Sequence, residues 1–304
     1  MFTAKNKGRL AIGAVAVGAA LALSGCASGD PLDTGSNAPS DSTTITVGSQ
    51  AYYSNEIIAE IYSQALENAG LTLERKFNIG QRDAYLPSLE NGDIDLFPEY
   101  TGNLLQFYDA KTTATTSDDV YSALAGALPK GLTVLDQASA TDQDSYNVTA
   151  KFAADNKLKS LADLAKVTTP LTLGGNAELE QRPYGPAGLL TAYGATVGFS
   201  ATGDTTVEDL LAGTVNIANV YSADPRIQTE KLVTLDDPKG LFLASNVVPL
   251  VNADIADSIA SVINAVQAKL TPEALVAMNV ESTVDQQSSA DIATKWLKDN
   301  GLLS

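Results

Sequence analysis

Short apolar stretches alternate along the chain with longer segments in which apolar residues recur every three or four positions. In the first part of the chain this pattern predicts, in order, strand, helix, strand, helix and two further strands, at residues 44–48, 56–68, 71–79, 83–90, 94–97 and 132–135. In the first of these helices Ile57, Ile58 and Ile61 fall on one face, and Gly70 follows as a stop signal. Strands that alternate with amphipathic helices are typical of an α/β fold.

A second series of strands and helices follows. Ser160, with Asp163 three residues later, forms the capping pattern of a helix start. Beyond it the pattern predicts a strand, a helix and a strand at residues 171–173, 206–212 and 215–220. The last part of the chain is expected to be helical at 255–270 and 289–300, with Thr-Pro-Glu at 271–273 starting another helix.

One segment of the first series resembles one segment of the second. Residues 89–95 and 210–216 both have the pattern of a helix end, a glycine and a strand, and the eighth residue after each glycine is a tyrosine, Tyr100 or Tyr221. This repetition indicates two related lobes, with chance as the alternative because such units are common. Ligands gather at the carboxyl ends of strands in open α/β sheets, so a cleft between the lobes would have one tyrosine on each wall.

The N-terminal residues predict a targeting signal rather than a folded element. Three basic residues precede an apolar stretch, residues 11–23, which is too short for a permanent membrane span. The stretch ends in Leu-Ser-Gly-Cys, which resembles the lipobox of bacterial lipoproteins and implies a signal peptide over residues 1–25 and diacylation of Cys26. Residues 26–43 predict a flexible tether, and the two acyl chains would hold the protein on the extracytoplasmic face of the cell membrane. The alternative is an ordinary secretory signal with an incidental cysteine.

Composition excludes several classes of function. The formal charge is −17, and removal of the three basic residues of the signal peptide leaves 16 basic against 36 acidic residues, or −20. Such a charge disfavours nucleic acid and anionic lipid as partners. The sequence has no histidine, and Cys26 is its one cysteine, which removes Ser–His and Cys–His nucleophiles and histidine-ligated metals. We therefore expect a binding protein rather than an enzyme, with no cofactor and no metal.

A series of sequence blocks resembles the substrate-binding proteins of quaternary-amine ABC importers, which include the glycine betaine, choline and carnitine binders of osmoprotectant uptake. The most specific block is Pro-Glu-Tyr-Thr-Gly at 98–102, and the resemblance extends from about Thr44 to the C-terminus. The other blocks are Gly-Ser-Gln at 48–50, Glu-Ile-Tyr at 60–62, Gly-Asp-Ile-Asp at 92–95, Asp-Gln-Asp-Ser-Tyr at 142–146, Arg-Pro-Tyr-Gly at 182–185, Val-Tyr-Ser-Ala-Asp at 220–224 and Leu-Asp-Asp-Pro-Lys at 235–239.

The resemblance implies a two-lobed fold of the type II periplasmic-binding-protein kind, with the ligand in the cleft between the lobes. Lobe 1 would hold residues 44–147 and 246–304, and lobe 2 would hold residues 148–245, with two hinge crossovers between them. It further implies a monomer that delivers a quaternary-ammonium ligand to a membrane permease, which a cytoplasmic ATPase drives.

The resemblance also implies a ligand cage made of tyrosine rings. Position by position, the cage would be Tyr100, Tyr146 and Tyr221. Asp144 would add electrostatic attraction, and Arg182 would hold a ligand carboxylate by a bidentate contact. The chemistry is sound on its own, because a quaternary ammonium ion has no N–H to donate. Ring faces attract it instead, with cation–π energies of about 0.5–2 kcal/mol each.

Three positions depart from the family pattern. Ser245 stands where many relatives have a fourth cage tyrosine, Gln50 where many have lysine, and Asn103 where many have threonine. A cage that is open on one side and lacks a cation favours a bulkier or less anionic ligand than glycine betaine, such as choline, carnitine or the betaine of a larger amino acid. Tyr52 or Tyr53 is expected to replace the missing wall.

The residues alone leave other interpretations open. Each tyrosine could be a half-buried core residue, and Arg182 could form an ion pair with Glu178 or Glu180. Asp142 and Asp144 are adjacent candidates, and either could cap a turn. The chain could bind another solute, such as an amino acid or a polyamine, could be a cell-envelope hydrolase with two carboxylates, or could be a structural lipoprotein that binds only protein.

Overall fold

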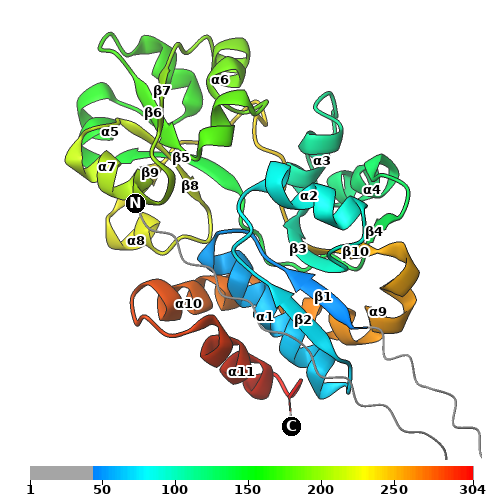
Figure 1. Cartoon of the computed structure of the whole chain (residues 1–304). Helices are drawn as coiled ribbons and strands as arrows, with labels where there is room; N and C mark the ends of the chain where they lie inside the picture. Colours follow the sequence, from blue (N-terminus) through cyan, green and yellow to red (C-terminus); the bar gives the residue numbers. More distant parts are fainter. Residues whose placement is uncertain (1–43, 304) are drawn as a thin grey trace, which may run out of the picture. The chain divides into compact units, whose positions relative to one another are not determined.

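The computed structural model describes residues 44–303, which form two lobes, each built on a five-stranded sheet (Figure 1). The predicted signal peptide, the expected anchor residue Cys26 and the predicted tether fall within residues 1–43, outside the described residues. Among the described residues, no helix has the length and apolar character that a membrane span requires.

The sheet of lobe 1 has the strand order β2-β1-β3-β10-β4. β1 is parallel to β2 and β3, whereas β10 is antiparallel to β3 and β4. The strands are β1 (Ile45–Gly48), β2 (Leu73–Lys76), β3 (Leu96–Tyr100), β4 (Leu132–Val134) and β10 (Val247–Asn252). The chain therefore returns from lobe 2 to insert β10 between two strands that it formed much earlier.

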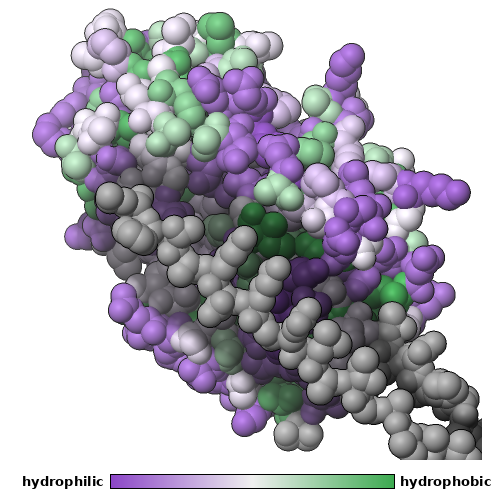
Figure 2. All heavy atoms as spheres, in the orientation of Figure 1, coloured by the Kyte–Doolittle hydropathy of each residue, from purple (hydrophilic) through white to green (hydrophobic). Residues whose placement is uncertain are grey.

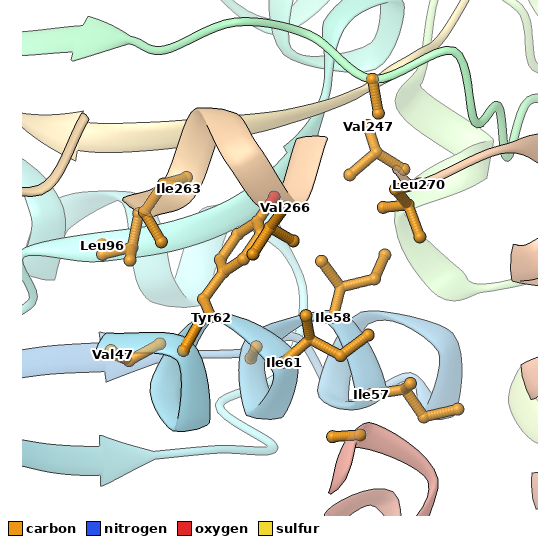
Figure 3. Close-up of a cluster of buried hydrophobic side chains, with 14 of the residues drawn as sticks. Val47, Ile57, Ile58, Ile61, Tyr62, Leu96, Val247, Ile263, Val266 and Leu270 are labelled. Carbon is orange, nitrogen blue, oxygen red and sulfur yellow. The ribbon is translucent and has the colours of Figure 1, made fainter. Parts of the chain in front are cut away.

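Helices cover both faces of this sheet, because successive strand residues are apolar on alternate sides. On one face Leu96 and Val247 belong to a core that includes Tyr62 (Figure 3). On the other face Phe97 and Val248 belong to a second core. The first core takes residues from α1 (Tyr53–Asn68), α9 (Ala253–Gln267), α10 (Pro272–Thr283) and α11 (Ser289–Asp299), and the second from α2 (Arg82–Glu90), α3 (Thr101–Tyr108) and α4 (Ser117–Ala127).

Lobe 2 repeats this arrangement with the strand order β7-β6-β8-β5-β9. β6 is parallel to β7 and β8, and β5 is antiparallel to β8 and β9. The strands are β5 (Asp144–Thr149), β6 (Thr172–Gly175), β7 (Gly198–Ala201), β8 (Ile217–Tyr221) and β9 (Leu232–Thr234). The helices are α5 (Ala150–Asn156), α6 (Pro186–Tyr193), α7 (Thr206–Ala212) and α8 (Arg226–Thr229), with three 3₁₀ segments, Leu161–Lys166, Ala177–Gln181 and Gly203–Thr205. The two-lobed α/β architecture expected from the sequence is confirmed.

The chain passes between the lobes twice, after β4 and after β9. Because β5 pairs only with strands of lobe 2, the first crossover ends before β5 and not after Asn147, where we expected the division. The two crossovers lie side by side, since Thr141 and Asn246 form an isolated β-bridge and the backbone N–H of Asp142 donates to the carbonyl of Ser245 (3.2 Å). This paired segment is where a hinge between the lobes would bend.

Candidate ligand-binding site

Three tyrosines from separate segments meet between the lobes. Tyr100 is the last residue of β3, Tyr221 is the last residue of β8, and Tyr52 directly precedes α1. All three line one small hollow, and the other residues that line it are Gln50, Arg82, Asn103 and Asp142. The structure thus brings together five of the residues that the sequence proposed as ligand contacts: Tyr52, Tyr100, Tyr221, Gln50 and Asn103.

The Tyr52 ring packs against two other tyrosine rings. The ring centroid of Tyr52 lies 5.0 Å from that of Tyr221 and 4.7 Å from that of Tyr53, with the planes tilted by 51° and 58°. The hollow has a volume of about 10 Å³, which is room for about one water molecule. Tyr52 and Tyr221 also line a much larger cleft, so in this conformation their two rings stand between the hollow and the cleft.

A buried carboxylate forms part of the hollow. The Tyr52 hydroxyl donates to Asp142 (3.0 Å), and the backbone N–H of Ala223 donates to its other oxygen (3.0 Å). Burial raises the pKa of Asp142 to about 7, although both hydrogen bonds act in the opposite direction and the carboxylates of Asp224 and Asp144 act with burial. Asp142 therefore changes its charge near neutral pH, directly beside the aromatic rings.

The arginine at the hollow is neutralised by a partner. Arg82 makes two hydrogen bonds to Glu99, from Nε (3.0 Å) and Nη2 (2.7 Å). Glu99 is fully buried and also accepts from the Tyr85 hydroxyl (2.5 Å) and from the backbone N–H of Tyr100 (2.9 Å). Gln50 extends this network, because its side-chain amide donates to the Tyr85 hydroxyl (3.1 Å). The network holds Gln50 and Arg82 in the lining of the hollow, and the carboxylate of Glu99 balances the charge of Arg82.

Asp144 and Ser245 lie beside the hollow and not in its lining. The Asn103 amide donates to Asp144 and to the Tyr184 hydroxyl (3.0 Å), and the Ser245 hydroxyl donates to the amide oxygen of Asn103 (2.6 Å). Asn103 also lines a neighbouring crevice whose walls include Asp144 and Tyr184. Asn103 is therefore the wall between the hollow and this crevice.

The structure does not bring Tyr146 to the hollow. Its side chain is fully buried in the core of lobe 2, where the ring packs edge-on against Phe242 (centroids 5.0 Å apart) and the hydroxyl donates to the carbonyl of Tyr184. Tyr184 itself comes closer to the site, because its hydroxyl bonds Asn103. Tyr146 thus lies in the core, which was the alternative to the cage in the interpretation of the sequence.

Arg182 likewise lies away from the hollow and faces lobe 1. Its guanidinium is 3.6 Å from the carboxylate of Asp83 and 5.6 Å from the ring centroid of Phe107. Neither Glu178 nor Glu180, the partners considered from the sequence, forms this ion pair. Both contacts cross from lobe 2 to helices of lobe 1, so Arg182 connects the lobes in this conformation.

Outside the tyrosine rings the lobes border a cleft of about 620 Å³. Its lining carries four acidic residues, Glu56, Asp204, Glu208 and Asp224, against one basic residue, Arg226. Arg226 is held by Asp224 (2.7 Å) and Glu208 (3.2 Å). On the face of the lobes drawn in Figure 2, hydrophilic and hydrophobic residues are mixed. The lining of the cleft therefore carries a surplus of negative charge.

Several residues at the site escaped the sequence analysis. Arg82, Tyr184 and Asn219 were not proposed, and Asp142 was named as a candidate beside Asp144 but was not included in the expected cage. Asn219 lines the cleft, and its amide donates to Asp144 (2.7 Å). Tyr184 could have been proposed from the sequence, since it belongs to the Arg-Pro-Tyr-Gly block. For Arg82 the sequence gave no indication, because nothing in a helical arginine shows that it pairs with a buried Glu99. Within residues 44–303 no group of three or more acidic side chains could hold a metal ion.

Two lobes of equal strand order, joined by paired crossovers and meeting at an aromatic hollow, define a two-lobed solute-binding protein. Residues 43–299 match the family described as the substrate binding domain of ABC-type glycine betaine transport systems, OpuAC, and the chain belongs to this family. The expectation of an extracytoplasmic binding protein that serves an ABC permease and is not an enzyme is thereby confirmed.

Individual relatives agree with this assignment. The chain is 26% identical over 276 residues to the glycine betaine-binding protein YehZ of Escherichia coli, covering 84% of this chain and 90% of that protein. It is 23% identical over 264 residues, 81% of this chain and 46% of the relative, to the ergothioneine transport permease/ergothioneine binding protein EgtU of Helicobacter pylori. The solved structure of apo YehZ matches with a TM-score of 0.62 at 26% identity over 86% of this chain and 99% of that one. A structure described as a glycine betaine/carnitine/choline ABC transporter has the same fold, with a TM-score of 0.69 at 20% identity over 86% of this chain and 100% of that one.

Proposed function

We propose that this protein captures a trimethylammonium compound whose cationic head lies between Tyr52, Tyr100 and Tyr221. The observation that carries the proposal is the convergence of three rings, from both lobes, on one hollow. Burial raises the pKa of all three phenols, so the rings are neutral at physiological pH. Neutral ring faces attract a cation that cannot donate hydrogen bonds. Relatives named for glycine betaine are consistent with such a head.

We further propose that the ligand carries a net positive charge, as choline does, rather than the balanced charges of glycine betaine. Among the residues described, the arginine of the hollow is paired with Glu99, and the arginine of the cleft is paired with Asp224 and Glu208. A ligand carboxylate would therefore find no unpaired cation at these positions. Asp142, which lines the hollow, attracts positive charge when it is ionised.

Entry of the ligand requires the lobes to separate. The hollow has room for about one water molecule, so a trimethylammonium head fits only when Tyr52 and Tyr221 move apart. Bending at the paired crossovers supplies such a movement, and closure then excludes water from the cation–π contacts. The rest of the ligand would extend into the cleft of about 620 Å³. Because the cleft has room for a larger molecule, larger betaines are the second candidate. Ergothioneine, for which the Helicobacter relative is named, is one of them.

A ligand panel tests the proposal. Isothermal titration and thermal unfolding would compare choline, glycine betaine, carnitine and ergothioneine with ethanolamine, which has choline's alcohol but N–H groups in place of the methyl groups. A ligand at 100 times its Kd should stabilise the fold by about 2.7 kcal/mol. We expect choline to bind more tightly than glycine betaine and ethanolamine to fail. Absence of binding by every trimethylammonium compound would overturn the proposal, and preference for glycine betaine would overturn the charge argument.

We also propose that the mature protein is anchored through diacylated Cys26, because a basic and apolar leader ends in Leu-Ser-Gly-Cys. We further expect the mature protein to be a monomer, as the family resemblance implies. Replacement of Cys26 by Ala should move the protein from the membrane fraction to the soluble fraction. An unchanged membrane fraction would contradict the anchor, and a dimer in light scattering would contradict the monomer.

A further inference from the structure

Asn103 joins the two lobes through its side-chain amide. It belongs to α3 of lobe 1, and its Nδ2 donates to Asp144 Oδ2 on β5 and to the Tyr184 hydroxyl (3.0 Å), both in lobe 2. Its Oδ1 accepts a hydrogen bond from the Ser245 hydroxyl in the second crossover (2.6 Å). Both N–H groups of the amide and its oxygen thus have protein partners.

The orientation of the amide follows from its neighbours. Asp144 is 4% exposed, and its Oδ1 accepts from the Asn219 amide (2.7 Å). An ionised carboxylate can only accept hydrogen bonds, so the nitrogen of Asn103 must face it and the oxygen must face Ser245. A threonine at position 103 has a single hydroxyl hydrogen, so it could not donate to Asp144 and to Tyr184 together as the amide does. The departure of Asn103 from the family pattern therefore has a structural role.

A close backbone approach brings Ser245 to Asn103. A Cβ on Gly102 would lie 2.6 Å from the carbonyl oxygen of Ala244, so only glycine lets α3 meet the crossover here. The small side chain of Ser245 then fits beside the amide, and its hydroxyl is also near the backbone N–H of Asn103 (3.4 Å). Two of the three departures from the family pattern, Asn103 and Ser245, thus touch each other and form one unit.

We propose that Asn103 and Asp144 form a bridge between the lobes that favours their closure and sets ligand affinity through that closure. Hydrogen bonds to a carboxylate are stronger than those between neutral groups, and opening of the lobes breaks both bonds from Asn103 at once. The apparent affinity of a ligand that needs closed lobes scales with the closed fraction. The bridge acts on the position of the lobes. It rests on the proposed function only because closure of the lobes is taken to enclose the ligand.

An exchange of the two side chains tests the bridge. Asn103→Asp would place two carboxylates against each other and open the lobes, and Asn103→Leu would remove the hydrogen bonds at similar volume. The double variant Asn103→Asp with Asp144→Asn restores one amide and one carboxylate in reversed order. Energy transfer between dyes at the exposed positions Glu74 and Leu190, one on each lobe, would report closure of the purified protein without ligand. Titration of choline and glycine betaine would report affinity.

We expect both single variants to lengthen the distance between the dyes and to raise the Kd of the bound compound about tenfold, mostly through faster release. The exchanged pair should recover the wild-type distance and most of the affinity. Unchanged distances in the single variants, or an exchanged pair as open as Asn103→Asp, would overturn the bridge. If the distances change and recover while no trimethylammonium compound of the panel binds, the bridge stands and the trimethylammonium proposal fails.

Discussion

The ion pair between Arg82 and Glu99 should decide whether the hollow prefers a cationic or a zwitterionic ligand. The variant Glu99→Gln removes the negative charge of this pair with little change of side-chain shape. Arg82 lines the hollow, and its side chain is 9% exposed, while Glu99 is fully buried. Glutamine can still accept a hydrogen bond from the guanidinium, but it carries no charge. The variant therefore exposes the ligand to a cation that the wild-type protein conceals.

The size of the effect follows from Coulomb's law for a ligand head in a hollow that Arg82 lines. A unit charge about 6 Å from the ligand head, at an effective dielectric constant of about 20, repels it by about 3 kcal/mol, or roughly a hundredfold in Kd. Glycine betaine should lose less, because its carboxylate gains an attraction that choline lacks. The ratio of the two affinities should shift toward glycine betaine by about tenfold or more. Breaking a buried pair also costs about 3–5 kcal/mol of folding free energy, so the melting temperature should drop by roughly 10 °C.

Titration calorimetry of both compounds, at a temperature well below the lowered melting point, gives the required ratio. The matched control is Arg82→Met with Glu99→Gln, which removes both charges and keeps a hydrogen-bond acceptor at position 99 for the Tyr85 hydroxyl and the Tyr100 backbone N–H. Choline should bind this double variant within a few-fold of wild type. An affinity ratio that stays the same in folded Glu99→Gln would refute the reasoning, because the concealed charge would then have no effect on ligand choice.

Three further predictions concern the rings, the second arginine and pH. Tyr100→Leu and Tyr221→Leu should each weaken choline binding by about 3- to 30-fold, whereas the phenylalanine variants keep the ring and most of the affinity; equal losses in leucine and phenylalanine variants would contradict a ring-face contact. Arg182→Ala should lower choline and glycine betaine affinity by the same factor, about fivefold or less, because Arg182 contacts Asp83 and Phe107 of lobe 1; selective loss of glycine betaine in calorimetry would instead support a carboxylate clamp. Because Asp142 loses its charge as the pH falls through its pKa of about 7, choline affinity should fall by up to about tenfold between pH 8 and pH 6, and Asp142→Asn should make the profile flat. A wild-type profile without this step would show that Asp142 does not act on the ligand.

Local apolar patterns predicted the parts of the fold that local sequence controls. The repeat at 89–95 and 210–216 places Tyr100 and Tyr221 at equivalent strand ends, and the structure has both tyrosines as the last residues of β3 and β8. The capping pair Ser160 and Asp163 is also present, although the segment it starts is a short 3₁₀ helix. In these segments the short-range signal and the tertiary environment agree.

Two strands next to the crossovers, β5 and β10, gave no such signal. β5 reads Asp-Ser-Tyr-Asn-Val-Thr, whose polar residues do not suggest a strand in the middle of a sheet, and β10 contains Pro249, which usually marks an edge. Pro249 lies directly opposite Pro98 of β3. Both strands are defined by partners that the chain supplies from distant segments, so pattern alone could not find them. Tyr146 was misplaced for the same reason, because the β5 register directs its ring toward Phe242.

The electrostatic character of the site is likewise a property of pairing and not of composition. A count of arginines would leave Arg82, Arg182 and Arg226 as equal candidates for a ligand carboxylate. The folded chain engages each of them with an acid of its own, Glu99, Asp83 or Asp224. Asp142 has only neutral donors, a tyrosine hydroxyl and a backbone N–H, so its charge is not cancelled when it ionises. The same three tyrosines beside a free arginine would suit a zwitterion, whereas beside Asp142 they suit a cation.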